Sequence, residues 1–488
     1  AGNTAVGKNC LDANTTASNN TAVGIDALGA NITGSSNTAV GRQALKANTG
    51  SNNTAVGLDA LATNIGGNTN VAVGSEALEK NTTGDGNTAV GTTALDANTT
   101  ADNNTAVGLS ALGANTTGGA NTALGRNALL ANTTASNNTA VGVNAMDTNT
   151  TGASNVAVGQ SALNANTTGA NNVAVGYHAG VAVTTGLQNT LIGMDTGNAL
   201  TDADFNVAVG TDALGADTLG SKSVAIGRRA LFSQNFTSAT DSLNTAVGFE
   251  AGNDLATGIN NTFMGALAGD ATDDGASNTA IGSSALSANC ADSNTAVGAV
   301  ALQAATGSNA TAVGMAAGLA NTSGSNNLFL GHDAGRSGSP GGEITTGSNE
   351  IVLGDADITE AHIQVDWTVA SDKRDKTDVT PMEMGLDFVN KLEPVTYKWD
   401  KRSNYVEKGE DFRDLITDGT HKEDWLDTGF LAQDVETLES EYGYNIADKT
   451  NLTTTLSDDG NQYGLTYSKF VPMLVKAVQE LSAKIAEL

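Results

Sequence analysis

A serine and a lysine five residues apart, Ser371 and Lys376, are the residues of this chain whose types and spacing could perform covalent chemistry. A serine hydroxyl is a weak nucleophile until a base accepts its proton, and a lysine amine accepts a proton only when it is neutral. Because a free lysine titrates near about 10.4, burial or a nearby positive charge such as Arg374 would have to lower its pKa. By spacing alone, such a pair is more often a solvated polar loop than a catalytic pair.

The other candidate nucleophiles and metal ligands form no recognisable site. Cys10 and Cys290 occupy different places in a sequence repeat, so we predict that each is a small buried substitute for Ala or Thr. We predict neither a metal site nor a cofactor, because no metal-ligand spacing links the four histidines, His178, His332, His362 and His421.

Most of the chain repeats one phrase, first seen as Asn3-Thr-Ala-Val-Gly7. It occurs 21 times, the last copy ending at Gly354, and 15 of the 20 intervals between copies are 17 residues long. The fifth position is always Gly and the fourth always aliphatic or Met, which predicts a short strand and a forced turn. One such rung cannot bury its apolar groups alone. We therefore predict a mainly β fold, a β-solenoid or β-roll rod in which Val, Leu and Asn stack into ladders.

The composition of the repeats predicts a multichain rod. Each rung offers Ala, Val and about one Leu to a core, which is little for a single chain, so we expect chains to share an axis along their Ala or Val faces as a homotrimer. The third-position Ala is replaced by larger residues at Leu191, Phe263 and Phe329, which we expect to mark wider or lateral features.

Charge and hydropathy exclude several classes of function. The formal net charge is −29, and the repeats lack the clustered Lys and Arg that nucleic-acid binding requires. No run of 18 apolar residues and no signal-peptide pattern occurs, so we expect no membrane insertion. Because the chain opens inside a repeat, we expect an N-terminal attachment region to be missing from it.

The end of the chain has the composition of a small globular domain. All three tryptophans and six of the seven tyrosines lie at or beyond Trp367. We predict a repeat shaft over 1–335, a junction over 336–370 and a C-terminal α+β domain over 371–488. Within the last two segments, we expect an alternating strand at 362–367, a helix start at 380–383 with Pro at its first position, and a strand at 395–399.

The closing helix carries a heptad-like seam. Its apolar residues are spaced alternately three and four apart: Val471, Leu474, Val478, Leu481, Ile485 and Leu488. This pattern predicts a coiled-coil seam that gathers several chains, or alternatively the buried face of a helix within one chain.

Two family resemblances follow from these motifs. The strand phrase resembles the parallel β-roll repeats in the heads of trimeric autotransporter adhesins, although their rungs are typically shorter. From Ser371 to Leu488 the chain is similar to the intramolecular chaperone auto-processing domain at the C-terminus of phage endosialidases, tail fibres and neck appendages. The matching pieces occur in the family's order: Ser371–Lys376, Gly385–Asp387, Leu392–Tyr397, Gly429–Val435, Tyr467 and Ala477–Leu481.

The second resemblance implies roles for particular residues. It implies a domain that trimerises, guides folding of the fibre and then cleaves the chain between Ala370 and Ser371. Ser371 would be the nucleophile and Lys376 its general base, in a single-turnover endopeptidase. The shaft itself is not predicted to be an enzyme, and retention of an uncleaved domain is the alternative.

The sequence therefore predicts a structural, host-binding fibre of a phage virion, assembled in the host cytoplasm. Its expected partners are two further copies of itself, a host surface receptor or glycan, and other virion proteins. The alternative is a secreted bacterial adhesin or an ice-binding solenoid, because Thr and Asn recur at fixed rung positions. A polysaccharide-degrading tail spike is disfavoured, because the repeats lack recurring paired carboxylates and aromatic residues.

Overall fold

The computed structural model describes residues 2–358, 360–364, 368–406, 411–457 and 459–487. Contacts divide the chain into two compact units, Ala1–Ser293 and Asn294–Leu488, which are described separately. No helix in the described residues has both the length and the apolar character of a membrane span.

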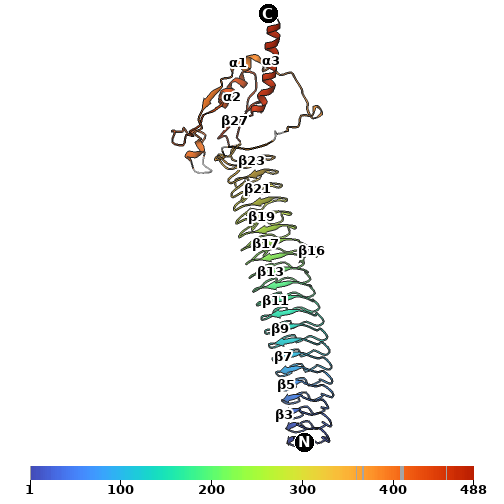
Figure 1. Cartoon of the computed structure of the whole chain (residues 1–488). Coiled ribbons are helices and arrows are strands. Elements are labelled where there is room, and N and C mark those ends of the chain that lie inside the picture. The colour runs from blue at the N-terminus through green and yellow to red at the C-terminus, as the bar shows by residue number, and fades with distance from the viewer. Residues whose placement is uncertain (1, 359, 365–367, 407–410, 458, 488) are drawn as a thin grey trace. The chain divides into compact units, whose positions relative to one another are not determined.

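The first unit is a parallel β-solenoid, as predicted, with one three-residue strand in each rung of about 17 residues (Figure 1). Its described principal strands are β1 Thr4–Val6, β2 Thr21–Val23, β3 Thr38–Val40, β4 Thr54–Val56, β5 Val71–Val73, β6 Thr88–Val90, β7 Thr105–Val107, β8 Thr122–Leu124, β9 Thr139–Val141, β10 Val156–Val158, β11 Val173–Val175, β12 Thr190–Ile192, β13 Val207–Val209, β15 Val224–Ile226, β17 Thr245–Val247, β18 Thr262–Met264 and β19 Thr279–Ile281. Two shorter strands pair with each other: β14 Gly220–Ser221, which follows β13, and β16 Thr240–Asp241, in the insertion between β15 and β17.

Successive rungs stack without a shift of register. In β2 and β3, for example, Ala22 lies opposite Ala39, and all three pairs of the two strands align. The ladder continues outside the strands, where the Leu28 amide donates to the Ala44 carbonyl at 3.1 Å. Because each rung uses the next one as its hydrogen-bonding partner, identical side chains form columns along the unit.

The interior of each rung is built by one chain. The third-position Ala of the phrase is fully buried from Ala22 onward, and so is a Leu six residues later, as at Leu28. Chains therefore cannot share an axis along the Ala face, and that part of the prediction is wrong. The Ala methyl instead fits against the same chain's Leu column, while the fourth-position residue faces outward.

The invariant Gly follows from the close approach of adjacent rungs. Gly24 has φ +135°, and a Cβ there would lie 2.4 Å from the Gly41 carbonyl oxygen. Any larger residue would therefore clash with the backbone of the next rung and strain its own. The buried Leu28 also adopts a left-handed conformation, with φ 51°, which burial of its side chain must offset.

Two columns of buried asparagines join the rungs. Asn48 Nδ2 donates to Asn31 Oδ1 at 3.2 Å and to the Gly50 carbonyl at 2.7 Å. In the other column, the Asn37 amide donates to Asn20 Oδ1 at 2.9 Å. Asparagine suits both columns because one side chain accepts from one neighbour and donates to another. The predicted Asn ladders are thus confirmed as interior features.

The large third-position residues lie inside the solenoid. Leu191, Phe263 and Phe329 are fully buried, so the predicted lateral features are wrong for these side chains. At each of these rungs and the rung before it, Gly replaces the usual column Leu, at Gly180 and Gly197, Gly252 and Gly269, and Gly318 and Gly335. A Cβ on Gly269 would lie 2.6–2.7 Å from the Phe263 ring, so the ring occupies the space of the missing Leu.

One asparagine column contains a buried acid, Asp217, in the rung of β13 that precedes the insertion. Asp217 accepts from the Gly220 amide at 3.0 Å, the Phe236 amide at 3.2 Å and Gln234 Nε2 at 2.6 Å. Burial raises its pKa, although these hydrogen bonds oppose the shift. The cysteines behave nearly as predicted: Cys290 is buried, which raises the pKa of its thiol, whereas Cys10 is half-buried.

The second unit holds four further rungs and a small α+β region that ends in a helix, as predicted. Its described strands and helices are β20 Thr295–Val297, β21 Thr311–Val313, β22 Leu328–Leu330, β23 Ile351–Leu353, η1 Lys373–Asp375, α1 Leu386–Lys391, β24 Val395–Tyr397, η2 Arg402–Tyr405, β25 Asp427–Gly429, α2 Ala432–Glu441, β26 Thr454–Leu456, β27 Tyr463–Leu465, η3 Tyr467–Lys469 and α3 Phe470–Ala486. β24 pairs with β25 and β26 with β27, both antiparallel.

Helices α1, α2 and α3 enclose the core of the α+β region, formed by Met384, Phe388, Val435, Leu438, Phe470 and Met473. Beside it, the buried Glu439 carboxylate accepts from the Thr453 amide and hydroxyl and from the Thr454 hydroxyl at 2.6–2.7 Å. These contacts tie α2 to the β26–β27 hairpin.

Two local predictions for this region need correction. The helix start predicted at 380–383 is wrong, because α1 begins at Leu386. Its first amide is satisfied by Glu480 of α3, whose carboxylate accepts from the Leu386 amide at 2.8 Å. Of the strand predicted at 362–367, residues 362–364 are not in a strand and residues 365–367 lie outside the described residues. The strand predicted at 395–399 is present as β24.

Candidate functional site

Ser371 and Lys376 are brought together by a single turn. Lys376 Nζ donates to Ser371 Oγ at 2.6 Å. The turn is η1, whose cap Asp372 accepts from the Arg374 amide at 2.9 Å. An Asp that bonds the backbone two residues on is a common way to begin such a turn, so the local sequence favours this geometry.

Arg374 is paired within the same turn. Its Nη2 lies 2.6 Å from Asp372 Oδ2, and its Nε donates to the same carboxylate at 3.1 Å. This side-chain hydrogen bond lowers the pKa of Asp372 and raises that of Arg374. The Arg374 charge is therefore balanced by Asp372. In this structure Arg374 does not act on Lys376 as an unpaired positive charge.

Water has full access to this pair in the single chain. Ala370, Ser371 and Lys376 are all exposed. Proton transfer from Ser371 to Lys376 requires the neutral amine, and removal of water around a lysine favours that form. The geometry can thus support a nucleophile and a base, while the environment that would activate them has to come from burial of the turn.

The closing helix α3 has two apolar faces. Phe470, Met473 and Ala477 are buried in the domain core. The predicted seam faces outward, with exposed fractions of 46–65 % for Val471, Leu474, Val478, Leu481 and Ile485, while Leu488 lies outside the described residues. The two predicted roles of the helix therefore apply to different faces. One face packs within the chain, and the seam is left open.

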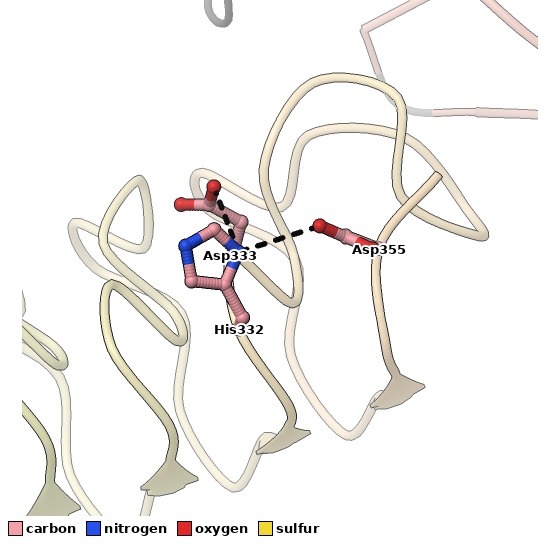
Figure 2. Close-up of side chains that lie close together, drawn as sticks. All are labelled: His332, Asp333 and Asp355. Carbon is pink, nitrogen blue, oxygen red and sulfur yellow. Dashed lines mark hydrogen bonds and ion pairs between the residues drawn. The ribbon is translucent and has the colours of Figure 1, made fainter. Parts of the chain in front are cut away.

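One histidine lies in a cluster that the sequence did not predict. His332 Nδ1 lies 3.2 Å from Asp333 Oδ2 and 3.5 Å from Asp355 Oδ2, so one ring nitrogen faces both carboxylates (Figure 2). Among the described residues, this is the group whose three side chains could hold a metal ion. Arg336 also pairs with Asp333 Oδ1 at 2.8 Å. The arrangement can hold a divalent cation between adjacent rungs.

A signal for this cluster was present in the repeat. His332 and Asp355 each stand three residues after the third position of their phrases, so they share one column. His178 and Asp195 share the neighbouring column, four residues after the third position, and His178 Nδ1 lies 3.3 Å from Asp195 Oδ1. The usual short spacing of metal ligands does not identify such pairs, because residues that are neighbours in a solenoid are one repeat apart in the sequence.

The fold and the site define a class of protein: a parallel β-solenoid of stacked rungs, followed by a small α+β region with a Ser–Lys turn and an exposed helical seam. Residues 371–444 match the model of a peptidase family described as "Chaperone of endosialidase". This match and the 17-residue solenoid are consistent with a protein of the phage tail fibre or endosialidase type. A search of curated proteins found no match.

Proposed function

We propose that this chain forms a homotrimeric phage tail fibre or similar virion appendage that contacts the host surface. Its C-terminal region would trimerise, guide folding of the repeats and then cleave the bond between Ala370 and Ser371. The observation that carries the proposal is the start of the chaperone family match at Ser371, the residue whose hydroxyl lies 2.6 Å from Lys376 Nζ.

The proposed cleavage begins when Ser371 Oγ attacks the carbonyl carbon of Ala370 and the neutral Lys376 amine accepts the hydroxyl proton. The peptide C–N bond then breaks as the Ser371 nitrogen takes up the proton held by Lys376, which leaves an ester between the Ala370 carbonyl and Ser371 Oγ and returns Lys376 to its neutral state. Water hydrolyses this ester: its OH goes to the Ala370 carbonyl carbon and its hydrogen to Ser371 Oγ. This step frees residues 371–488.

In this proposal, association of the chains activates the Ser371–Lys376 pair. The Ser–Lys turn and the α3 seam are both exposed in one chain. Neighbouring chains that cover the turn would exclude water from the lysine and favour its neutral form. Cleavage would then follow trimerisation, so that a misassembled fibre keeps its chaperone.

Mass analysis of the purified full-length product tests the proposal. Wild type should yield a product ending at Ala370, while Ser371→Ala and Lys376→Ala should remain intact and trimeric. Lys373→Ala is the matched control, because this exposed lysine lies in the same turn and should leave cleavage unchanged. An intact wild-type chain that differs from Ser371→Ala only by the mass of one oxygen atom would refute self-cleavage. Deletion of residues 371–488 should leave aggregated repeats, and soluble trimers from this deletion would refute the chaperone role.

The threonine columns favour the second candidate, an adhesin or ice-binding solenoid. In consecutive rungs Thr82 Oγ1 donates to the Thr99 carbonyl at 2.9 Å, and Thr99 Oγ1 to the Thr116 carbonyl at 3.1 Å. The neighbouring Thr83, Thr100 and Thr117 are exposed, so this edge presents a regular polar array. Thermal hysteresis of the purified protein would support the ice-binding candidate, and its absence would remove it.

A further inference from the structure

We propose that copies of this chain pack side by side along the outward face of the shaft strands, parallel and in register. This strand face comprises the first and third residues of each principal strand from β1 to β19, the two residues that flank the buried Ala. The inference rests on the proposed homotrimer and names the surface that the trimer would use along the shaft.

The strand face carries no charge. In the described part of Ala1–Ser293 there are 17 principal strands, and their outward positions hold only Thr, Val, Leu, Ile and Met. The same stretch of sequence contains 21 acidic and 8 basic side chains, a formal net charge of −13. Strand propensity accounts for the β-branched residues but not for the exclusion of Lys, Glu and Gln, which solvent-facing strand positions tolerate.

The apolar column of this face is continuous and accessible. The third strand residue is nowhere buried in β1–β19, and its exposed fraction is 58 % at Val6 in the first rung and 48 % at Leu124 within the ladder. If each rung offers on the order of 50 Å², the unit presents roughly 800 Å², about the area that one partner supplies to a specific interface. A monomer rarely leaves an apolar stripe of this size uncovered.

The period of the stripe identifies the occupant as a second copy of the chain. Its Val side chains repeat once per rung, about every 4.8 Å, along a ladder with no register shift. Only a partner with the same rise per rung can match every position, and another copy does so at each of them. Confining the acidic residues to other faces also keeps like charges of neighbouring chains apart.

Cysteine cross-linking in the full chain tests this surface. The background carries Cys10→Ala, Cys290→Ala and Ser371→Ala, so that it has no other thiol and stays uncleaved. Val90→Cys places a thiol on the strand face, where Val90 is 36 % exposed. Thr100→Cys is the matched control, on an exposed turn of the same rung. Val478→Cys in the α3 seam reports separately on the proposed C-terminal trimer.

Mild oxidation should convert Val90→Cys and Val478→Cys to covalent oligomers on a denaturing gel, and leave Thr100→Cys at the monomer mass. Cross-linking of Val478→Cys without Val90→Cys would overturn the strand-face inference and leave the proposed trimer standing. Failure of both would overturn the proposed trimer as well. Equal cross-linking of Val90→Cys and Thr100→Cys would also refute a specific face. As a second measurement, Val90→Glu should lower the thermal midpoint of the assembly more than Thr100→Glu does.

Discussion

Phe263 and Gly269 allow a direct test of how the interior of the solenoid is filled. The Phe263 ring is fully buried, and a Cβ on Gly269 would lie 2.6–2.7 Å from three of its atoms. In the next rung the same column holds Leu286, buried and with φ 50°, close to the φ 61° of Gly269. A Leu at position 269 is therefore compatible with the backbone, and the three atoms nearest to its Cβ all belong to the ring.

The two single variants should both destabilise the shaft. Phe263→Ala removes a buried ring and leaves a cavity against glycine, which typically costs about 3 to 5 kcal/mol. Gly269→Leu forces a side chain into the ring, and such overpacking costs about 1 to 3 kcal/mol. If the sites were independent, the double variant would lose roughly 4 to 8 kcal/mol. Because Leu at 269 refills the space of the ring, we instead expect a loss of about 1.5 kcal/mol or less, a coupling of at least about 2.5 kcal/mol.

Urea unfolding of the four proteins measures this coupling, and hydrogen exchange of the amides in 246–282 localises it, since repeat proteins can unfold in segments. Phe205→Ala is the control, because this ring is 48 % exposed and its removal should cost clearly less than removal of the fully buried Phe263 ring. A double variant as unstable as the sum of the single variants would refute the proposed exchange of Phe for Leu.

Two further predictions concern buried polar groups. Asn98 Nδ2 donates to Asn81 Oδ1 at 2.9 Å, and Asn98 Oδ1 accepts from Asn115 Nδ2 at 3.0 Å. Because Asn98→Ala leaves both of these buried partners unsatisfied, it should lower the free energy of unfolding in urea by about 2 to 4 kcal/mol. The exposed Thr100→Ala is the control and should be nearly neutral. For Asp217, whose folded pKa burial raises above 3.8, stabilisation is present below about pH 4 and is lost as pH rises through the folded pKa. The Gly220 and Phe236 amides should therefore exchange faster at neutral pH, after correction for intrinsic rates, and Asp217→Asn should remove this trend. A trend of the opposite sign would contradict the burial argument.

The repeat made the solenoid predictable, because a fixed period and an invariant Gly leave few other ways to stack short strands. The face that each residue occupies was harder to assign. Alternation along Thr21-Ala22-Val23 places Ala22 on one face of the strand and Thr21 and Val23 on the other, but it does not indicate which face is the interior. The structure assigns the interior to the small residue because Leu28, in a left-handed conformation, fills the space beneath it.

The Ser371–Lys376 turn was predictable for a different reason. Both residues belong to one local turn capped by Asp372, so no long-range contact is needed to bring them together. The start of α1 depends instead on Glu480, 94 residues away in sequence, and the Thr380-Pro381 signal could not compete with that contact. A turn formed by neighbouring residues could thus be predicted from the sequence, whereas a helix start that depends on a distant side chain could not.

The buried Leu191, Phe263 and Phe329 change how the register of the shaft is specified. A uniform 17-residue ladder could slip by one rung at little cost, which is why an external device at the C-terminal end is expected to align it. These three residues stand four rungs apart, and each fits only where Gly replaces Leu in its own and the preceding rung. If the pairing of rungs slipped by one, a large side chain would clash with a Leu of the column, and the position that pairs with the Gly residues would be left with a cavity. The rungs before that of β11 carry neither a large third-position residue nor the Gly that accommodates one. Because each of these fits is made inside one chain, it fixes the register of the rungs within that chain. The alignment of neighbouring chains is still expected to come from the C-terminal region.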